Sequence, residues 1–339
     1  MKKSNWKGKN GPLLIAEIGG NHEGNFSYAK KLTKLAIKSD VDVIKFQIYT
    51  GDTLVNKLSS PSRNKHFKKF QLTQDQHIYL AKMCNDNGVK YLASVWNVES
   101  LNWIDKYLDY YKIGSGDLTC YQIIQEFAKR GKPIILSSGL STMKEINETI
   151  KFLIGRNRKY KSSNNLSVLQ CTSTYPTEDK DANLRVIKSL KKNKNITAGY
   201  SDHTIGSLAL LTAYSLGAQV LEFHFTDTRK NKTFRDHKVS LDMIETKELI
   251  QNIKRIKKML GKNIKKPTKE EIKSNHTISF RRAIFLKKDY SKGQIIKEND
   301  LISLRPNIGI DARDFKKVVG KKTKRDIKML EKLKFNKNV

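Results

Sequence analysis

The chain alternates between short apolar runs and longer segments with helix-compatible spacing. The eight runs in the first two-thirds span residues 13–19, 41–49, 90–96, 110–115, 133–139, 165–173, 196–203 and 218–225. Strands that are buried on both faces read as nearly continuous apolar runs, and their alternation with helices indicates right-handed crossovers in a parallel sheet. Eight such units need roughly 250 residues, and a last helical segment at 243–260 closes the count near that length. The pattern therefore predicts a (β/α)8 barrel, the TIM-barrel class of α/β fold.

The pattern changes beyond residue 262. Residues 263–276 are polar and charged, contain one proline and show no apolar periodicity, which predicts a linker. From residue 277 short apolar stretches alternate with turn signals, of which Lys292-Gly293 is one. We therefore expect a barrel domain at 1–262, a linker at 263–276 and a small β-rich domain at 277–339. Two segments of the barrel are expected to be irregular: residues 1–12, a basic leader, and residues 56–69, a long loop of the kind that carries substrate contacts or lids.

The formal net charge of +33 raises the question of nucleic-acid binding. The 53 lysines outnumber the 13 arginines and are spread along the whole chain, whereas base and phosphate recognition favours arginine. No nucleic-acid-binding motif with interleaved aromatic residues accompanies them. A biased genome composition explains this charge more simply than a nucleic-acid surface does.

Cysteine usage and the lack of long apolar runs indicate a cytoplasmic protein. Cys84, Cys120 and Cys171 have neither disulfide nor metal-ligand spacing, and we interpret them as buried small hydrophobic residues in a reducing compartment. No run approaches the roughly 20 residues of a membrane span, and the start has no apolar signal region.

Polar residues collect at the ends of the expected strands, where active sites of (β/α)8 barrels lie. They are Glu17, Lys45, Gln47, Ser94, Lys112, Ser115, Ser137, Thr172, Ser173, Ser201, His203, Glu222 and His224. His203 and His224 end the seventh and eighth strands, so their imidazoles can converge on a metal ion and leave other coordination positions open. Lys45 and Lys112 stand within apolar strands, where an unpaired ammonium is costly to bury unless an anionic ligand compensates it.

Several motifs at these strand ends resemble those of the sialic acid synthases, also called nonulosonic acid synthases. They are AEIGGNHEGN at 16–25, VIKFQ at 43–47, YKIGSGDLT at 111–119, GKPIILSSGLST at 131–142, QCTSTYPT at 170–177, GYSDHTIG at 199–206, LEFHFT at 221–226 and RDHKVSLD at 235–242. The C-terminal segments KGQIIKENDLISLRPNIGI and VGKKTKRDIK resemble the antifreeze-like (SAF) domain that follows the barrel in that family. The resemblance runs from about residue 13 to residue 328.

The resemblance implies a condensation of phosphoenolpyruvate with an N-acylated amino-sugar aldehyde, giving a nine-carbon 2-keto acid and inorganic phosphate. The sugar would be N-acetylmannosamine or a di-N-acetylated trideoxyhexose. It also implies a divalent cation, Mn²⁺ or Mg²⁺, held by His203 and His224 to polarise the aldehyde, and a homodimer in which the small domain of one chain covers the barrel mouth of the other.

Roles for individual residues follow from the same resemblance. The phosphoenolpyruvate site would be lined by Lys45, Ser94, Lys112, Ser115, Ser137, Ser173 and Ser201. Glu17 would contact the sugar and the attacking water, and Asp236 the sugar hydroxyls. Gln47 and Tyr175 would make further sugar contacts, and Arg305 would reach the N-acyl group bound by the partner subunit.

Three departures from the family pattern bear on the identity of the sugar. The string Ala93-Ser94-Val95-Trp96-Asn97 stands where many relatives have Ser-Thr-Pro-Phe, so the aromatic residue is larger. Ser173 and Thr174 stand where an asparagine is common. Arg281 and Arg282 occupy a place where some synthases have apolar residues facing the sugar.

The remaining histidines are given lesser roles. We expect His237 to hydrogen-bond the substrate or its loop, His22 to contact substrate, and His66, His77 and His276 to lie on the surface. Two other functions remain open at this point: another phosphoenolpyruvate-dependent barrel synthase that makes a 3-deoxy keto acid, or a non-catalytic carbohydrate-binding protein. The antifreeze-like segment disfavours the first, and the intact strand-end residues disfavour the second.

Overall fold

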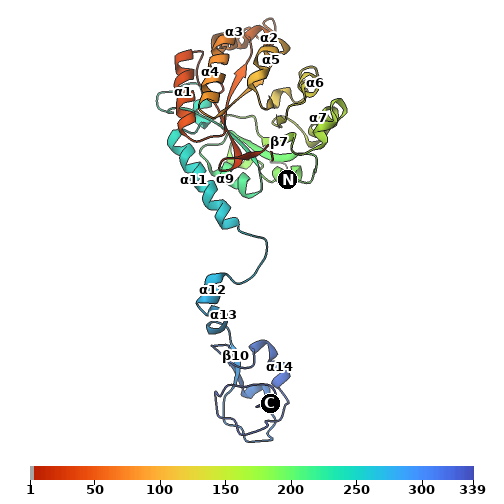
Figure 1. Cartoon of the computed structure of the whole chain (residues 1–339), viewed down its shortest axis with the longest axis vertical. Helices are drawn as coiled ribbons and strands as arrows, with labels where there is room; N and C mark the ends of the chain where they lie inside the picture. Colours follow the sequence, from red (N-terminus) through yellow and green to blue (C-terminus); the bar gives the residue numbers. More distant parts are fainter. Residues whose placement is uncertain (1–3) are drawn as a thin grey trace. The chain divides into compact units, whose positions relative to one another are not determined.

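The computed structural model describes residues 4–339, which form two compact units, 4–261 and 262–339. The first unit is a closed barrel of eight parallel strands in sequential order, with helices around it (Figure 1). Its strands are β2 (Gly11–Glu17), β3 (Val43–Ile48), β4 (Lys90–Val95), β5 (Tyr111–Ile113), β6 (Ile134–Ser137), β7 (Leu166–Cys171), β8 (Thr197–Asp202) and β9 (Val220–His224). Pairing of β2 with β9 closes the barrel, which confirms the predicted fold class.

Helices follow the strands and cover their outer faces. They are α1 (Phe26–Lys38), α4 (Gln74–Asp86), α5 (Val98–Ile104), α6 (Tyr121–Arg130), α7 (Met143–Arg156), α8 (Val186–Leu190), α9 (Leu208–Ser215) and α11 (Met243–Leu260). Capping boxes at Thr73, Thr142 and Asp242 satisfy backbone donors at the first turns of α4, α7 and α11. The main apolar core lies between these helices and the strands.

The N-terminal segment is part of the barrel rather than a plain basic leader. Trp6 is 1% exposed and packs with Leu13, Val43 and Tyr110 in a second core inside the barrel. Its indole nitrogen donates to the carbonyl of Ser163 at 2.6 Å, and β1 (Lys7–Gly8) pairs antiparallel with β2. Trp6 stands alone among lysines and glycines, so the pattern of apolar and polar residues did not predict that this segment packs into the barrel.

The segment expected to be a loop at 56–69 is largely helical. It contains α3 (Pro61–Phe70), preceded by α2 (Gly51–Leu54). Asn64 holds the two helices together, because its side-chain amide donates to the carbonyls of Gly51 and Val55 at 2.8 and 2.9 Å. Proline at the first helical position of α3 is favourable, since its missing N–H would have no partner there.

The second unit has a core of its own, which includes Ile284, Ile296, Val318 and Leu333. Its antiparallel strands are β10 (Ala283–Leu286) and β11 (Leu301–Leu304), followed by the short helix α14 (Phe315–Val318). The expected linker contains two short helices, α12 (Lys269–Lys273) and α13 (His276–Ser279).

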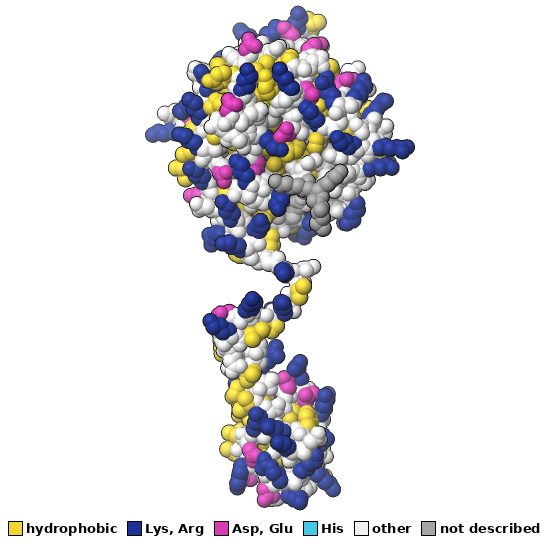
Figure 2. All heavy atoms as spheres, viewed as in Figure 1, with side chains coloured by type: hydrophobic (Ala, Val, Ile, Leu, Met, Phe, Trp, Pro, Cys, Tyr) yellow, Lys and Arg dark blue, Asp and Glu magenta, His cyan; other side chains and the backbone are white. Residues whose placement is uncertain are grey.

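Lysine and arginine are scattered over the face shown in Figure 2, without one large basic patch. No helix within residues 4–339 is long and apolar enough to cross a membrane.

His77 and His22 are buried, which corrects two expectations. His77, on α4, is 1% exposed rather than on the surface, and its Nδ1 lies 2.9 Å from the hydroxyl of Tyr91. His22 accepts a hydrogen bond from the backbone of Gly24 and lies against Phe46, outside the cavity described below. Burial lowers the pKa of His77 to about 3 and that of His22 to about 4.

These pKa shifts predict acid destabilisation that begins below about pH 6.5. Both imidazoles are neutral in the folded chain, whereas the unfolded chain takes up their protons near pH 6.5, so the stabilisation is complete above that pH and is lost as the pH falls toward 4. At pH 4.5 the loss is on the order of 2 kcal/mol for each histidine. Unfolding free energies measured between pH 7 and 4.5 should fall less steeply for His77→Gln, which keeps a partner for Tyr91. Equal slopes for the two proteins would contradict this prediction.

Candidate active site

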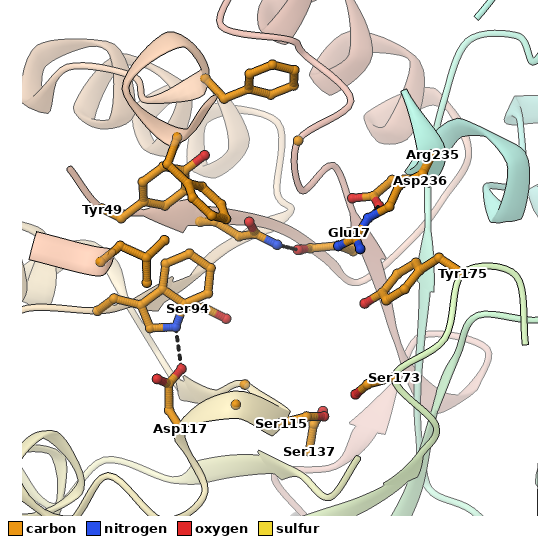
Figure 3. Close-up of a pocket in the computed structure, with 18 of the residues that line it drawn as sticks. Glu17, Tyr49, Ser94, Ser115, Asp117, Ser137, Ser173, Tyr175, Arg235 and Asp236 are labelled. Carbon is orange, nitrogen blue, oxygen red and sulfur yellow. Dashed lines mark hydrogen bonds and ion pairs between the residues drawn. The ribbon is translucent and has the colours of Figure 1, made fainter. Parts of the chain in front are cut away.

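A cavity of about 1060 Å³ opens at the C-terminal ends of the barrel strands. His22 and Thr172 do not line it, but the barrel residues given a catalytic, metal or substrate role by the family resemblance do: Glu17, Lys45, Gln47, Ser94, Lys112, Ser115, Ser137, Ser173, Tyr175, Ser201, His203, His224 and Asp236. Figure 3 shows Ser115, Ser137 and Ser173 on one side of the cavity, with Arg235 and Asp236 away from them near Glu17. Arg305 belongs to the second unit, where it follows β11 and its guanidinium lies 5.5 Å from the ring centre of Phe280.

The floor of the cavity is a buried cluster of two lysines and two glutamates. Lys45 lies 2.9 Å from Glu17 and 3.8 Å from Glu222, and Lys112 lies 3.4 Å from Glu222. Burial alone lowers the pKa of Lys45, but the carboxylates of Glu17 and Glu222 outweigh it and raise the pKa. For Lys112 burial dominates, and its pKa is lowered. Glu222 thus compensates the buried ammonium groups; the sequence placed it at a strand end but gave it no role.

Neighbouring side chains orient the members of this cluster. Ser201 donates to Glu222 Oε1 at 3.1 Å, and Lys112 donates to Ser137 Oγ at 2.8 Å. Burial raises the pKa of Glu222, but the two lysines outweigh that effect and bring it to about 2, so Glu222 is ionised. Lys112 also makes a long hydrogen bond, 3.5 Å, to the carbonyl of Ile113.

Glu17 is the carboxyl group of the cluster whose pKa is raised. Gln47 donates to Glu17 Oε1 at 2.9 Å (Figure 3). Burial raises the pKa of Glu17, and the nearby Glu222 raises it further, against the lowering effect of Lys45. A carboxyl group with a raised pKa that faces a polar cavity is suited to exchange a proton with a bound water.

His203 and His224 meet as the sequence predicted, with ring centres 5.3 Å apart. His203 donates from Nδ1 to the carbonyl of Thr172 at 2.6 Å, which fixes its tautomer and leaves the Nε2 lone pair available. Burial lowers the pKa of His224 to about 4, so this imidazole is neutral, and its Nδ1 has no hydrogen-bond partner among the described residues. No group of three histidine, cysteine, aspartate or glutamate residues within 4–339 is arranged to hold a metal. Burial lowers the pKa of His203, but its hydrogen bonds to Cys171 and Thr172 and the nearby Asp202 outweigh that effect and raise it. His203 and His224 are the residues that would hold a cation, whose other ligands would come from substrate and water.

The segment expected to be a loop with substrate contacts reaches this cavity through α3, and the sequence analysis named none of its residues as site residues. Arg63, His66, Phe67 and Phe70 all line it and follow the i, i+3, i+4, i+7 spacing of one helix face. Phe67 meets Tyr49 edge to face at 5.2 Å, and Phe70 lies 5.0 Å from Phe234. His66 is exposed, as expected, and it also borders the cavity. This spacing is present in the sequence, but the lysines between these positions lower the contrast between the two faces of the helix, so the helix was not predicted.

Other cavity residues also escaped the sequence prediction. Cys171 lines the cavity, with its sulfur 3.8 Å from His203 Nδ1, and Cys120 is only partly buried, so neither fits the expected role of a simple core residue. Arg235 lies over the ring of Tyr175 at 4.4 Å and donates to Asp236 at 3.2 Å. His237 bonds its own loop, since it lies 2.7 Å from Thr226 Oγ1.

Comparison with known proteins agrees with this geometry. The NeuB family model matches residues 32–265, and the SAF domain model matches residues 281–333. The chain belongs to the NeuB family. This NeuB-family chain is 35% identical to the N,N'-diacetyllegionaminic acid synthase of Campylobacter jejuni, over 91% of this chain and 95% of the relative. It is 33% identical to the protein of the same name from Legionella pneumophila, over 91% and 89% of the two chains.

A solved structure of the same kind resembles this NeuB-family chain. The N-acetylneuraminic acid synthetase of Leptospira borgpetersenii, in complex with citrate, superposes with a TM-score of 0.72 at 26% identity. The match covers 79% of this chain and 91% of that chain. The two domain matches confirm the resemblance read from the sequence motifs.

Proposed function

We propose that this protein condenses phosphoenolpyruvate with an N-acylated amino-sugar aldehyde to form a nonulosonic acid and inorganic phosphate. The observation that carries the proposal is the buried Lys45–Glu17–Glu222–Lys112 cluster, which lines the same cavity as two histidines and several serines at the barrel mouth. This arrangement offers cationic and hydroxyl donors to an anion on one side and a proton-exchanging carboxyl group on the other. Family membership favours this reaction over a 3-deoxy keto acid synthase, because the SAF domain accompanies the barrel.

In this proposal Lys45, Lys112 and the serines hold the carboxylate and phosphate of phosphoenolpyruvate. A carbon–carbon bond forms between its methylene carbon and the aldehyde carbon, whose oxygen takes up a proton to become a hydroxyl group, and water adds to the resulting cationic C2. Glu17 accepts a proton from that water, and breakage of the C–O bond then releases phosphate. Asp236 and Gln47 position the sugar through its hydroxyl groups, and Tyr175 borders the same part of the cavity.

His203 and His224 are proposed to hold a divalent cation, Mn²⁺ or Mg²⁺. When bound, such a cation supplies Lewis-acid polarisation of a carbonyl oxygen. The proposed dimer, in which each small domain covers the partner's barrel, would add Arg305 to the site. The three cysteines are free thiols, which supports the expected cytoplasmic location.

The proposal is tested by measuring phosphate released from phosphoenolpyruvate with a panel of amino sugars. We expect a di-N-acetylated trideoxyhexose to give a kcat/KM at least about tenfold above that of N-acetylmannosamine, because apolar groups of a substrate gain from an apolar wall. Tyr49, Phe67, Phe70 and Phe234 provide that wall. No phosphate release with any sugar of the panel would contradict the proposed function.

A second prediction concerns the buried cluster. Lys112→Met should abolish measurable turnover and also destabilise the fold by about 3–5 kcal/mol, because Glu222 loses its nearer cation. The double variant Lys112→Met/Glu222→Gln should recover much of the unfolding free energy without recovering activity. Turnover by the Lys112→Met variant would show that Lys112 does not bind phosphoenolpyruvate.

A further inference from the structure

Trp96 joins two strand ends that carry different parts of the site. It follows β4, and its backbone N–H donates to the carbonyl of Ile48 at the end of β3, at 3.1 Å. Its side-chain Nε1–H donates to Asp117 Oδ2, in the turn that follows β5 (Figure 3). Phenylalanine, the residue that the family pattern has near this position, offers no such donor.

The turn that receives this hydrogen bond also carries Ser115. It is a single 3-10 turn, Ser115–Asp117, closed by the backbone N–H of Asp117 donating to the carbonyl of Gly114 at 3.0 Å. The backbone N–H of Gly139, after β6, donates to Ser115 Oγ at 3.1 Å. The orientation of Ser115 in the cavity therefore depends on a turn held from both neighbouring strand ends.

Asp117 places a negative charge where an anionic substrate is proposed to bind. Its side chain lines the same cavity as Ser115 and Lys112. Burial raises the pKa of Asp117, while the indole N–H and the charge of Lys112 act in the opposite direction. A free carboxylate beside a phosphate would cost binding energy through like-charge repulsion, which is strong in a partly buried site.

The indole holds this carboxylate against the backbone. A Cβ atom added to Gly114 would lie 3.5 Å from Asp117 Oδ2 and 4.0 Å from Trp96 Nε1, so the bonded pair packs directly on Gly114. Trp96 is itself fixed by Tyr49, whose ring centre lies 5.2 Å away. The donor is therefore presented by a packed ring rather than by a mobile side chain.

We propose that Trp96 is a positioning residue for phosphoenolpyruvate, which confines the Asp117 carboxylate to Gly114 and fixes the turn that carries Ser115. The inference rests on the proposed function, since it assigns the phosphoenolpyruvate side of the same cavity. Trp96 also borders the aromatic wall through Tyr49, so a role in sugar binding is the competing explanation. The two roles differ in which Michaelis constant they affect.

The test is steady-state kinetics of Trp96→Phe with both substrates varied. We expect the KM for phosphoenolpyruvate to rise about tenfold, the effect of losing one hydrogen bond to a charged group, with less than about a twofold change in kcat and in the sugar KM. Trp103→Phe is the matched control, because Trp103 lies on α5 outside the cavity lining. It should leave all three constants unchanged.

A double variant distinguishes the hydrogen bond from Trp96 to Asp117 from other effects of the indole ring. In an Asp117→Ala background the acceptor is gone, so adding Trp96→Phe should change the phosphoenolpyruvate KM by less than about twofold. An unchanged phosphoenolpyruvate KM in the single variant, a rise in the sugar KM alone, or independent effects in the double variant would each overturn the inference. Phosphate release by the unaltered protein, measured in the same assay, shows separately whether the proposed function holds.

Discussion

Replacing His203 or His224 by alanine is expected to lower kcat at least about a thousandfold, because the reaction would lose several kcal/mol of carbonyl polarisation. The proteins should remain folded, since each histidine faces the cavity and neither belongs to the apolar core clusters. Binding of Mn²⁺, followed by titration calorimetry or by the paramagnetic signal, should weaken in parallel with activity.

His276→Ala is the matched control, because it removes an exposed histidine of the second unit. It should leave both Mn²⁺ binding and turnover within about twofold of the unaltered protein. Full activity after exhaustive chelation would refute the metal proposal. Intact Mn²⁺ binding in both alanine variants would place the cation elsewhere.

The barrel could be predicted from sequence because its strands are buried on both faces. Runs such as 41–49 and 218–225 are too continuously apolar for half-exposed strands, and their order fixed the parallel topology. The α3 helix was missed for the opposite reason. Its cavity face holds Arg63 and His66, and its outer face is rich in lysine, so the helix lacks the ordinary contrast between apolar and polar sides.

The candidate site residues could be predicted from their places at strand ends. Which charged groups pair with one another depends on the register between neighbouring strands. Glu222 precedes His224 by two residues, so both side chains face the barrel interior, and this spacing is enough to place Glu222 at the strand end with the site. Its role as the common partner of Lys45 and Lys112 could not have been read from spacing. That role depends on the pairing that places Ser201 opposite Glu222 and Ser94 opposite Lys112 across the sheet.

Arg305 is the one proposed site residue outside the barrel, and mixing experiments can test its role. It follows β11 in a unit that begins at Lys262, after the last barrel helix. If Arg305 binds the N-acyl group held by a partner chain, Arg305→Ala should lower kcat/KM for the sugar at least about a hundredfold, because charged hydrogen bonds are among the strongest in a site. The phosphoenolpyruvate KM should change little. Arg313→Ala, which removes an exposed arginine of the same unit, is the matched control.

Mixing inactive His203→Ala chains with inactive Arg305→Ala chains should then restore activity. One barrel mouth of each mixed dimer would combine an intact histidine from its own chain with an intact arginine from the partner. With free subunit exchange half of the dimers are mixed and each has one complete mouth, so recovery should approach about a quarter of the unaltered activity. Subunit exchange can be followed with two differently labelled chains. If exchange is complete and activity stays at the level of the separate variants, Arg305 acts within its own chain or has no role in the reaction, and the shared site is ruled out.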